Sequence, residues 1–242
     1  MQIINQQTTF RYQESGFFLV QEPMANNKGE IDLKGLHIIS TGQQTKDEFV
    51  KKASSIQKFV DYIHLREREW SATDHIEVIG RLIKAGLPLE KIIVNDRVDI
   101  AVMEQTGGVQ LASHSLDIQK VKHFFPTMPI GCSVHDMAEA IEKEKCGADF
   151  LLFGHIFSTY SKPGLPPRGL KKLKCLISSV TIPVIAIGGI KPNNVSRILD
   201  TGAKGVAVLS GVLLEEDSLQ AASEYREKLM AGKGGVEDDI IY

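Results

Sequence analysis

Histidine and arginine side chains alternate where an apolar, strand-like segment ends. His64, Arg66 and Arg68 share one parity along the chain, whereas Ile63 and Leu65 share the other. Successive side chains of a strand point to opposite faces, so the apolar pair would pack on helices and the polar three would share the other face. An anion is the natural partner of an arginine held in such a place. The pattern predicts an anion site at this strand end, with solvated surface charge as the alternative.

A serine and a histidine share a face at the end of a later apolar segment. Ser133 and His135 have the same parity, and a histidine at a strand end is a candidate general acid–base group. His135 is therefore a candidate for acid–base chemistry, with helix capping or an ordinary loop hydrogen bond as the structural alternative. His155, which follows Gly154, is a second candidate.

The remaining histidines receive a structural interpretation. His37 comes too early in its segment to stand at a strand end. His75, His114 and His123 fall at helix or loop positions.

Secondary-structure elements must position these side chains, and strand-like and helix-like segments alternate regularly along the chain. The strand-like runs are nearly continuous in Val, Ile and Leu, which is typical of strands buried on both faces of a parallel sheet. Alternation with helices indicates βαβ units. The predicted strands are 33–40, 60–67, 91–96, 107–113, 129–135, 148–157, 182–189 and 203–210. The predicted helices are 46–58, 74–85, 97–104, 116–124, 136–145, 170–177, one that begins near Pro192, and 218–229.

Eight such units in about 200 residues fit a closed (β/α)8 TIM barrel of the α/β class. A doubly wound open sheet is the alternative, but it would gather functional residues at one switch point. Here polar residues end almost every predicted strand. We predict a barrel domain at 33–231, an N-terminal extension at 1–32 and a C-terminal tail at 232–242.

Glycines follow the last two predicted strands. One strand ends in Gly188-Gly189 and the next in Ser210-Gly211. Glycine lets backbone N–H groups approach a ligand closely, and the loops after strands 7 and 8 form the usual phosphate site of this barrel. The four residues are predicted to hold a phosphate group, with tight turns as the alternative role of the glycines.

Composition excludes several classes of protein. Hydrophobic residues make up 43% and charged residues 24%, as in an ordinary globular chain. No apolar run approaches the roughly 18 residues of a membrane span, and a net charge of −2 does not indicate a nucleic-acid partner. The three cysteines have no metal-site or disulfide spacing, and the N-terminus lacks a signal-peptide pattern. We expect a cytoplasmic protein with a small-molecule substrate and no membrane partner, and a homo-oligomer is compatible with the sequence.

Taken together, the strand ends resemble the thiamine phosphate synthase superfamily from about Leu33 to Leu229. The motifs that carry the resemblance are HLRER (64–68), VNDRVDIA (94–101), GVQLAS (108–113), GCSVH (131–135), GADFLLFGHIF (147–157), IPVIAIGGI (182–190) and GAKGVAVLSG (202–211). The superfamily holds two enzymes. A synthase joins a pyrimidine pyrophosphate to a thiazole phosphate with magnesium, and a thiazole tautomerase (TenI type) aromatises a thiazole carboxylate phosphate without metal.

Residues that differ between the two branches favour the tautomerase. The synthase holds magnesium through two acidic residues after strands 3 and 4. Asp96 matches the first, but Ser115 falls at the second, and a hydroxyl is a poor substitute for a carboxylate there. Arg68 stands where synthases carry lysine, and His155 where they carry proline. Asp96 and Lys162 also occur in synthases, which keeps that branch open.

The resemblance implies an isomerase of thiamine biosynthesis that uses neither a metal nor another cofactor. It would convert the 2-carboxy-4-methylthiazol-5(2H)-ylidene ethyl phosphate tautomer into aromatic 2-(2-carboxy-4-methylthiazol-5-yl)ethyl phosphate, with His135 moving the proton. Arg66 and Arg68 would hold the carboxylate or stabilise developing negative charge. The predicted substrate-binding residues are Arg66, Arg68, Ser113, Ser133, His155, Lys162, Gly188, Gly189, Ser210 and Gly211. The alternatives are the magnesium-dependent synthase and a non-catalytic regulator that binds thiazole phosphate on the same barrel.

Overall fold

The computed structural model describes residues 11–13, 16–18 and 33–231 of the 242-residue chain. The chain divides into two units, Met1–Asp32 and Leu33–Tyr242. In the first unit, β1 (Arg11–Gln13) pairs antiparallel with β2 (Gly16–Phe18). Most of the predicted extension and all of the predicted tail at 232–242 lie outside the described residues.

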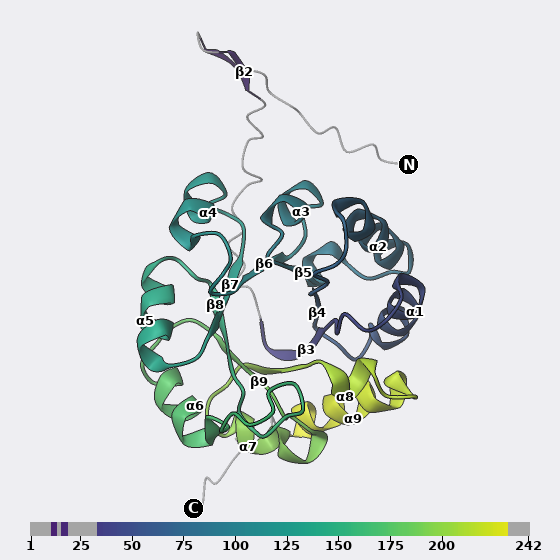
Figure 1. Cartoon of the computed structure of the whole chain (residues 1–242), viewed down its shortest axis with the longest axis vertical. Helices are drawn as coiled ribbons and strands as arrows, with labels where there is room; N and C mark the ends of the chain where they lie inside the picture. The colour runs from purple at the N-terminus through teal and green to yellow at the C-terminus, as the bar shows by residue number, and fades with distance from the viewer. Residues whose placement is uncertain (1–10, 14–15, 19–32, 232–242) are drawn as a thin grey trace, which may run out of the picture. The chain divides into compact units, whose positions relative to one another are not determined.

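The second unit is a closed barrel of eight parallel strands surrounded by helices (Figure 1). The strands close in the order β10-β3-β4-β5-β6-β7-β8-β9, which confirms the (β/α)8 barrel and excludes the doubly wound sheet. They are β3 (Gly35–Ile39), β4 (Tyr62–Leu65), β5 (Ile92–Asn95), β6 (Gly108–Leu111), β7 (Ile130–Val134), β8 (Phe150–Gly154), β9 (Val184–Ile187) and β10 (Gly205–Val208).

Every predicted helix is present, with ends shifted by a few residues. The helices are α1 (Lys46–Ile56), α2 (Ala72–Lys84), α3 (Val98–Met103), α4 (Ile118–Phe124), α5 (Met137–Lys145), α6 (Gly169–Ile177), α7 (Val195–Leu199) and α9 (Ser218–Ala231). The 3-10 turn η2 (Pro192–Asn194) begins at the predicted start of the helix that α7 continues, whereas α8 (Ser210–Leu213) and the 3-10 turn η1 (Leu89–Lys91) were not predicted. No helix within the described ranges is long and apolar enough to cross a membrane.

Two apolar cores explain why the strands are hydrophobic on both faces. Ile63 and Leu65 belong to the larger core between strands and helices, as their parity predicted. Side chains such as Phe150, Leu152 and Ile185 form a second core inside the barrel. Full burial of one such side chain contributes about 1.5–3 kcal/mol. Because both faces of the strands are apolar, a polar residue inside the barrel is an exception to this pattern.

Two histidines inside the barrel form a hydrogen-bonded pair. His37 Nε2 lies 3.0 Å from the carbonyl oxygen of Leu33, which only accepts, so this nitrogen carries the hydrogen. His37 Nδ1 is then the acceptor for His64 Nε2, 2.9 Å away. Both side chains are fully buried, so His64 lies inside the barrel and does not reach its mouth with Arg66. Burial lowers the pKa of His37 to about 4 and the pKa of His64 well below its ordinary value.

Acid should destabilise the fold through this pair. An imidazole with its ordinary pKa of 6.5 in the unfolded chain is protonated there first. The stability that the neutral pair contributes is therefore fully present above about pH 6.5 and is lost as the pH falls toward 4. For His37 alone, the free energy of unfolding should drop by about 3 kcal/mol between pH 7 and pH 4.

Urea denaturation at the two pH values measures this drop. His37→Gln should be less stable than the wild type at pH 7 but should lose less stability on acidification. The matched control is His123→Gln, because His123 is exposed on α4 and should leave the full drop in place. Equal drops in the wild type and in His37→Gln would contradict the role of the pair.

Candidate functional site

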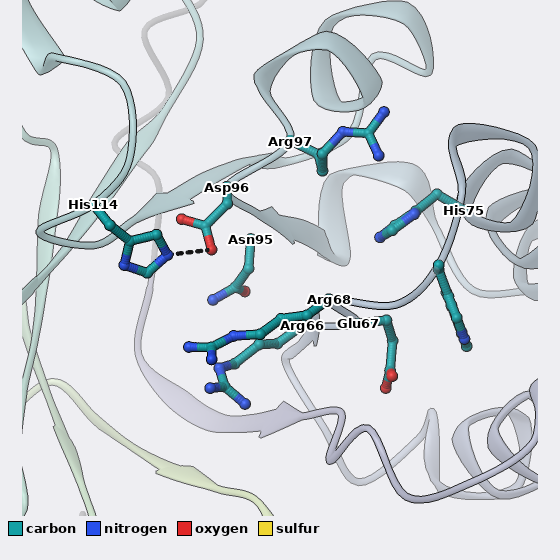
Figure 2. Close-up of a pocket in the computed structure, with 9 residues that line it drawn as sticks. Arg66, Glu67, Arg68, His75, Asn95, Asp96, Arg97 and His114 are labelled. Carbon is teal, nitrogen blue, oxygen red and sulfur yellow. Dashed lines mark ion pairs between the residues drawn. The ribbon is translucent and has the colours of Figure 1, made fainter.

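A pocket of about 430 Å³ opens where β4, β5 and β6 end (Figure 2). A volume of this size is typical of small-molecule sites. We call it the arginine pocket. Its lining residues are Arg66, Glu67, Arg68, Trp70, His75, Asn95, Asp96, Arg97 and His114.

Arg66 and Arg68 leave the end of β4 and extend side by side in the same direction (Figure 2). The backbone N–H of Arg66 donates to the Ser40 hydroxyl at 2.7 Å, which ties this strand end to the end of β3. Among the described residues, neither guanidinium has a carboxylate within ion-pair distance. Burial, and then the charge of Arg68, lower the pKa of Arg66. Two adjacent cations without a carboxylate partner among the described residues would favour an anionic ligand, and the anion site stays a prediction.

On the far side of the pocket, the side chains are held by contacts within the protein. Glu67 is buried and accepts the N–H of Gly42 at 3.2 Å. His75 is buried, with Nδ1 2.9 Å from the Ser71 carbonyl oxygen and its ring edge-on to Trp70. These contacts agree with the structural interpretation of His75.

Asp96 is the centre of a polar cluster between β5 and β6. Its backbone is left-handed, with φ of 63°, a conformation that Asp tolerates better than most residues. The Ser115 hydroxyl donates to one carboxylate oxygen, and His114 Nε2 lies 3.4 Å from the other. Ser115 also accepts the N–H of Ala112 at 2.7 Å, which closes the loop onto the end of β6.

The magnesium ion of the synthase branch does not fit this donor set. The structure brings together the two positions that the resemblance had matched, Asp96 and Ser115. The cluster offers one carboxylate, one hydroxyl and one imidazole, whereas magnesium takes several oxygen ligands, usually including carboxylates. The sequence interpretation missed His114 as a pocket residue. Its position beside Ser115 was the available signal.

Polar side chains also line the barrel interior near the pocket. Asn95 and Gln110 are neighbours in the β5–β6 register, and Gln110 Nε2 donates to the Ser133 hydroxyl at 3.1 Å. Asn95 Oδ1 and Gln110 Oε1 are buried and have no hydrogen-bond partner among the described residues. The sequence analysis predicted Ser133 as a substrate-binding residue but missed Asn95 and Gln110. Both are polar residues whose parity in apolar strands directs them into the barrel, and this was the available signal.

His135 lies directly after β7 and is exposed. Its backbone N–H donates to Glu139 Oε2 at 2.7 Å, and the Asp136 carboxylate accepts the Glu139 N–H at 2.9 Å to start α5. These bonds fix the backbone at His135, while its imidazole has no hydrogen-bond partner among the described residues. His135 does not line the arginine pocket.

The loop after β8 holds two further predicted residues. His155 is 6% exposed, and its Nε2 lies 3.3 Å from the Leu165 carbonyl oxygen. Arg168 Nε donates to the Gly154 carbonyl oxygen at 2.8 Å, so both ends of the loop are tied to β8. Lys162 is half-buried in this loop, and Ser113 is exposed after β6.

The predicted phosphate residues follow two adjacent strands. Ala207 of β10 pairs with Ile187 of β9, so both glycine segments leave the same edge of the barrel. Gly189 has φ of 65°, and a Cβ there would lie 2.5 Å from the Ser158 carbonyl oxygen. A Cβ on Gly211 would lie 2.7 Å from the Tyr225 hydroxyl. Chain packing therefore accounts for these glycines without a ligand, and phosphate binding by Gly188, Gly189, Ser210 and Gly211 stays a prediction.

Comparisons with known proteins identify relatives along most of the barrel. A family model described as thiamine monophosphate synthase matches residues 36–212. The thiamine-phosphate synthase of Pyrococcus furiosus is 42% identical over 134 residues, which are 55% of this chain and 65% of that protein. The match therefore spans just under two thirds of that relative. The thiamine-phosphate synthase of Pyrococcus abyssi is 32% identical over 193 residues, covering 79% of this chain and 93% of that protein.

Solved structures agree with these relatives. Thiamine phosphate pyrophosphorylase from Pyrococcus furiosus superposes with a TM-score of 0.74 at 31% identity, over 85% of this chain and 99% of that one. A 3-hexulose-6-phosphate synthase from Salmonella typhimurium superposes with a TM-score of 0.63 at 15% identity, over 81% of this chain and 99% of that one. The second likeness shows the barrel fold alone.

Gly189→Ala should lower the free energy of unfolding by about 1–3 kcal/mol, because the new Cβ meets carbonyl oxygens and the backbone is left-handed. Urea denaturation measures the change. Gly80→Ala is the matched control, since its Cβ would enter open space on α2 and should be neutral or stabilise by up to about 1 kcal/mol. Wild-type stability of Gly189→Ala would show that packing does not require this glycine.

Proposed function

This chain belongs to the thiamine monophosphate synthase family, an enzyme family of thiamine biosynthesis, and we propose that it is a thiazole tautomerase. The proposed substrate is the 2-carboxy-4-methylthiazol-5(2H)-ylidene ethyl phosphate tautomer. Its product is the aromatic 2-(2-carboxy-4-methylthiazol-5-yl)ethyl phosphate. The reaction is an isomerisation that moves one proton from carbon to carbon.

The Asp96–Ser115 contact is the observation that carries the proposal. Where a synthase needs a second carboxylate for magnesium, this chain places a hydroxyl that donates to Asp96. The contact satisfies one Asp96 oxygen within the protein, and His114 faces the other. A metal-independent reaction agrees with this chemistry.

The substrate would span two anion sites at the same end of the barrel. Arg66 and Arg68 would hold the ring carboxylate, and the backbone N–H groups after β9 and β10 would hold the phosphate. Breaking the C–H bond beside the carboxylate leaves an electron pair that becomes a ring double bond. The exocyclic carbon then takes up a proton, and the guanidinium groups stabilise the negative charge that develops meanwhile. His135 would transfer the proton.

The relatives' names favour a second candidate, the transferase thiamine-phosphate synthase. Several relatives that carry this name are 32–42% identical to this chain. Asp96 and Lys162, which also occur in synthases, are present. A non-catalytic regulator that binds thiazole phosphate is a third candidate, since a shared barrel does not establish chemistry.

One pair of assays separates these candidates. The purified chain is incubated with the unaromatised thiazole phosphate in EDTA, and aromatisation is followed by near-ultraviolet absorbance. It is also incubated with thiazole phosphate, a pyrimidine pyrophosphate and magnesium, and thiamine phosphate is measured. The tautomerase predicts acceleration in the first assay alone. Thiamine phosphate formed only in the second assay would establish the synthase, and product binding without turnover in either would establish the regulator.

His135→Asn should lower tautomerase turnover by roughly 10²–10⁴-fold, the usual contribution of general acid–base catalysis. Asparagine keeps hydrogen-bonding capacity but cannot exchange a proton near neutral pH. Binding of the aromatic product, measured by calorimetry, should change little because other residues hold both anions.

His123→Asn is the matched control, because His123 is exposed on α4 and lies outside the pocket. It should turn over like the wild type. Loss of both turnover and product binding in His135→Asn would make His135 a binding residue, and near-normal turnover would transfer its role to another group.

A further inference from the structure

The proposed reaction starts at the ring carbon that bears the carboxylate. If Arg66 and Arg68 hold that carboxylate, the carbon to which it is attached lies in or beside the arginine pocket. A base that removes its proton must come within hydrogen-bond reach of the same place. The identity of this base rests on the proposed function, because the tautomerisation is the reaction that requires it.

Most of the proton acceptors in the pocket are already engaged. Glu67 is buried against Gly42, and His75 Nδ1 is bonded to the Ser71 carbonyl oxygen. Asp96 accepts from Ser115 and faces His114. His114 differs from these groups, because its side chain is 59% exposed and only one of its ring nitrogens faces a protein group.

The contact with Asp96 orients the His114 imidazole. Nε2 of His114 lies at ion-pair distance, 3.4 Å, from Asp96 Oδ2, and because a carboxylate only accepts, this contact favours the neutral tautomer with its hydrogen on Nε2. Nδ1 then has a free lone pair and no hydrogen-bond partner among the described residues. A carboxylate behind a histidine fixes its tautomer and balances the charge that the ring gains with a proton. Figure 2 shows this contact on the same side of the pocket as the two guanidinium groups.

His135 occupies a different position. It follows β7 and does not line the arginine pocket, whereas His114 follows β6 and does. β7 is separated from β9 by one strand, so His135 lies closer in the strand order to the predicted phosphate loops. The exocyclic carbon is the end of the substrate nearer the phosphate. Two histidines on neighbouring loops therefore match the two carbons between which the proton moves.

We propose that His114, oriented by Asp96, removes the proton from the ring carbon and that His135 delivers a proton to the exocyclic carbon. His114 Nδ1 takes the proton, and the electron pair of the broken C–H bond forms a double bond between that ring carbon and the ring nitrogen. The electron pair of the former ring C=N bond shifts to form the double bond between the methyl-bearing carbon and the ring carbon that carried the exocyclic double bond. The electron pair of the exocyclic double bond takes the proton from His135. His114 then releases its proton to water and His135 regains one from water, so the enzyme returns to its starting state.

Hydrogen exchange in D2O separates the two half-reactions. Exchange at the ring carbon of unconverted substrate, followed by proton NMR, reports removal and return of that proton without product formation. His135→Asn should form product at least 100-fold more slowly than the wild type but retain exchange at the ring carbon above the rate in buffer. His114→Asn should lose that exchange and product formation together, by roughly 10²–10⁴-fold.

Two further variants test the arrangement. Asp96→Asn keeps a residue that tolerates the left-handed backbone but removes the negative charge, so exchange should fall about tenfold while calorimetric binding of aromatic product stays within about twofold. His123→Asn should match the wild type in both measurements. A merely structural role for His114 would instead weaken product binding and lower the melting temperature of His114→Asn.

The outcomes separate this proposal from the proposed function. No aromatisation by the wild type contradicts the tautomerase itself. Wild-type aromatisation with exchange lost in His135→Asn but retained in His114→Asn identifies His135 as the ring-carbon base and overturns the present proposal alone. Exchange that is retained in both variants, or lost in both, overturns the present proposal as well. If exchange is retained in both, His114 is not required to remove the proton. If it is lost in both, His114 does not remove the proton independently of His135.

Discussion

Closure of eight parallel strands is the constraint on which the site depends. In a closed parallel barrel every second residue of each strand faces the interior, and all eight strand ends meet at one rim. Arg66 and Asp96 are far from Ser210 in sequence, but closure brings their loops to the same rim. The apolar cores on both strand faces provide the stability that holds these loops in place.

Not every polar group inside the barrel supports that stability. His37 and His64 contribute to it as a neutral, hydrogen-bonded pair, while Asn95 and Gln110 each leave a carbonyl oxygen without a partner among the described residues. An unsatisfied buried polar group costs about 1–3 kcal/mol. Such a cost is tolerated where a ligand or an ordered water supplies the missing donor, and Asn95 lines the arginine pocket.

Strand parity predicted much of the barrel and part of the site. Alternation placed Ile63 and Leu65 against the helices and directed Arg66 toward the pocket. Strand parity could not place His114, because a loop has no periodicity. The left-handed backbone of Asp96 and the hydrogen bond between Ser115 and Ala112 set the path of the chain around His114. Nor could strand parity separate the two roles of Gly189, because close chain packing and close ligand approach both require the absence of Cβ.

The cluster around Asp96 suggests how one barrel supports two chemistries. A carboxylate paired with a second carboxylate accumulates negative charge, which favours a divalent cation. Ser115 removes that second charge and donates a hydrogen bond, so Asp96 keeps one oxygen for an imidazole. The same aspartate that could serve a metal in one setting can then orient a histidine in another. In the proposed function, the residue at position 115 decides whether a second carboxylate stands beside Asp96, while the strands that position both loops stay the same.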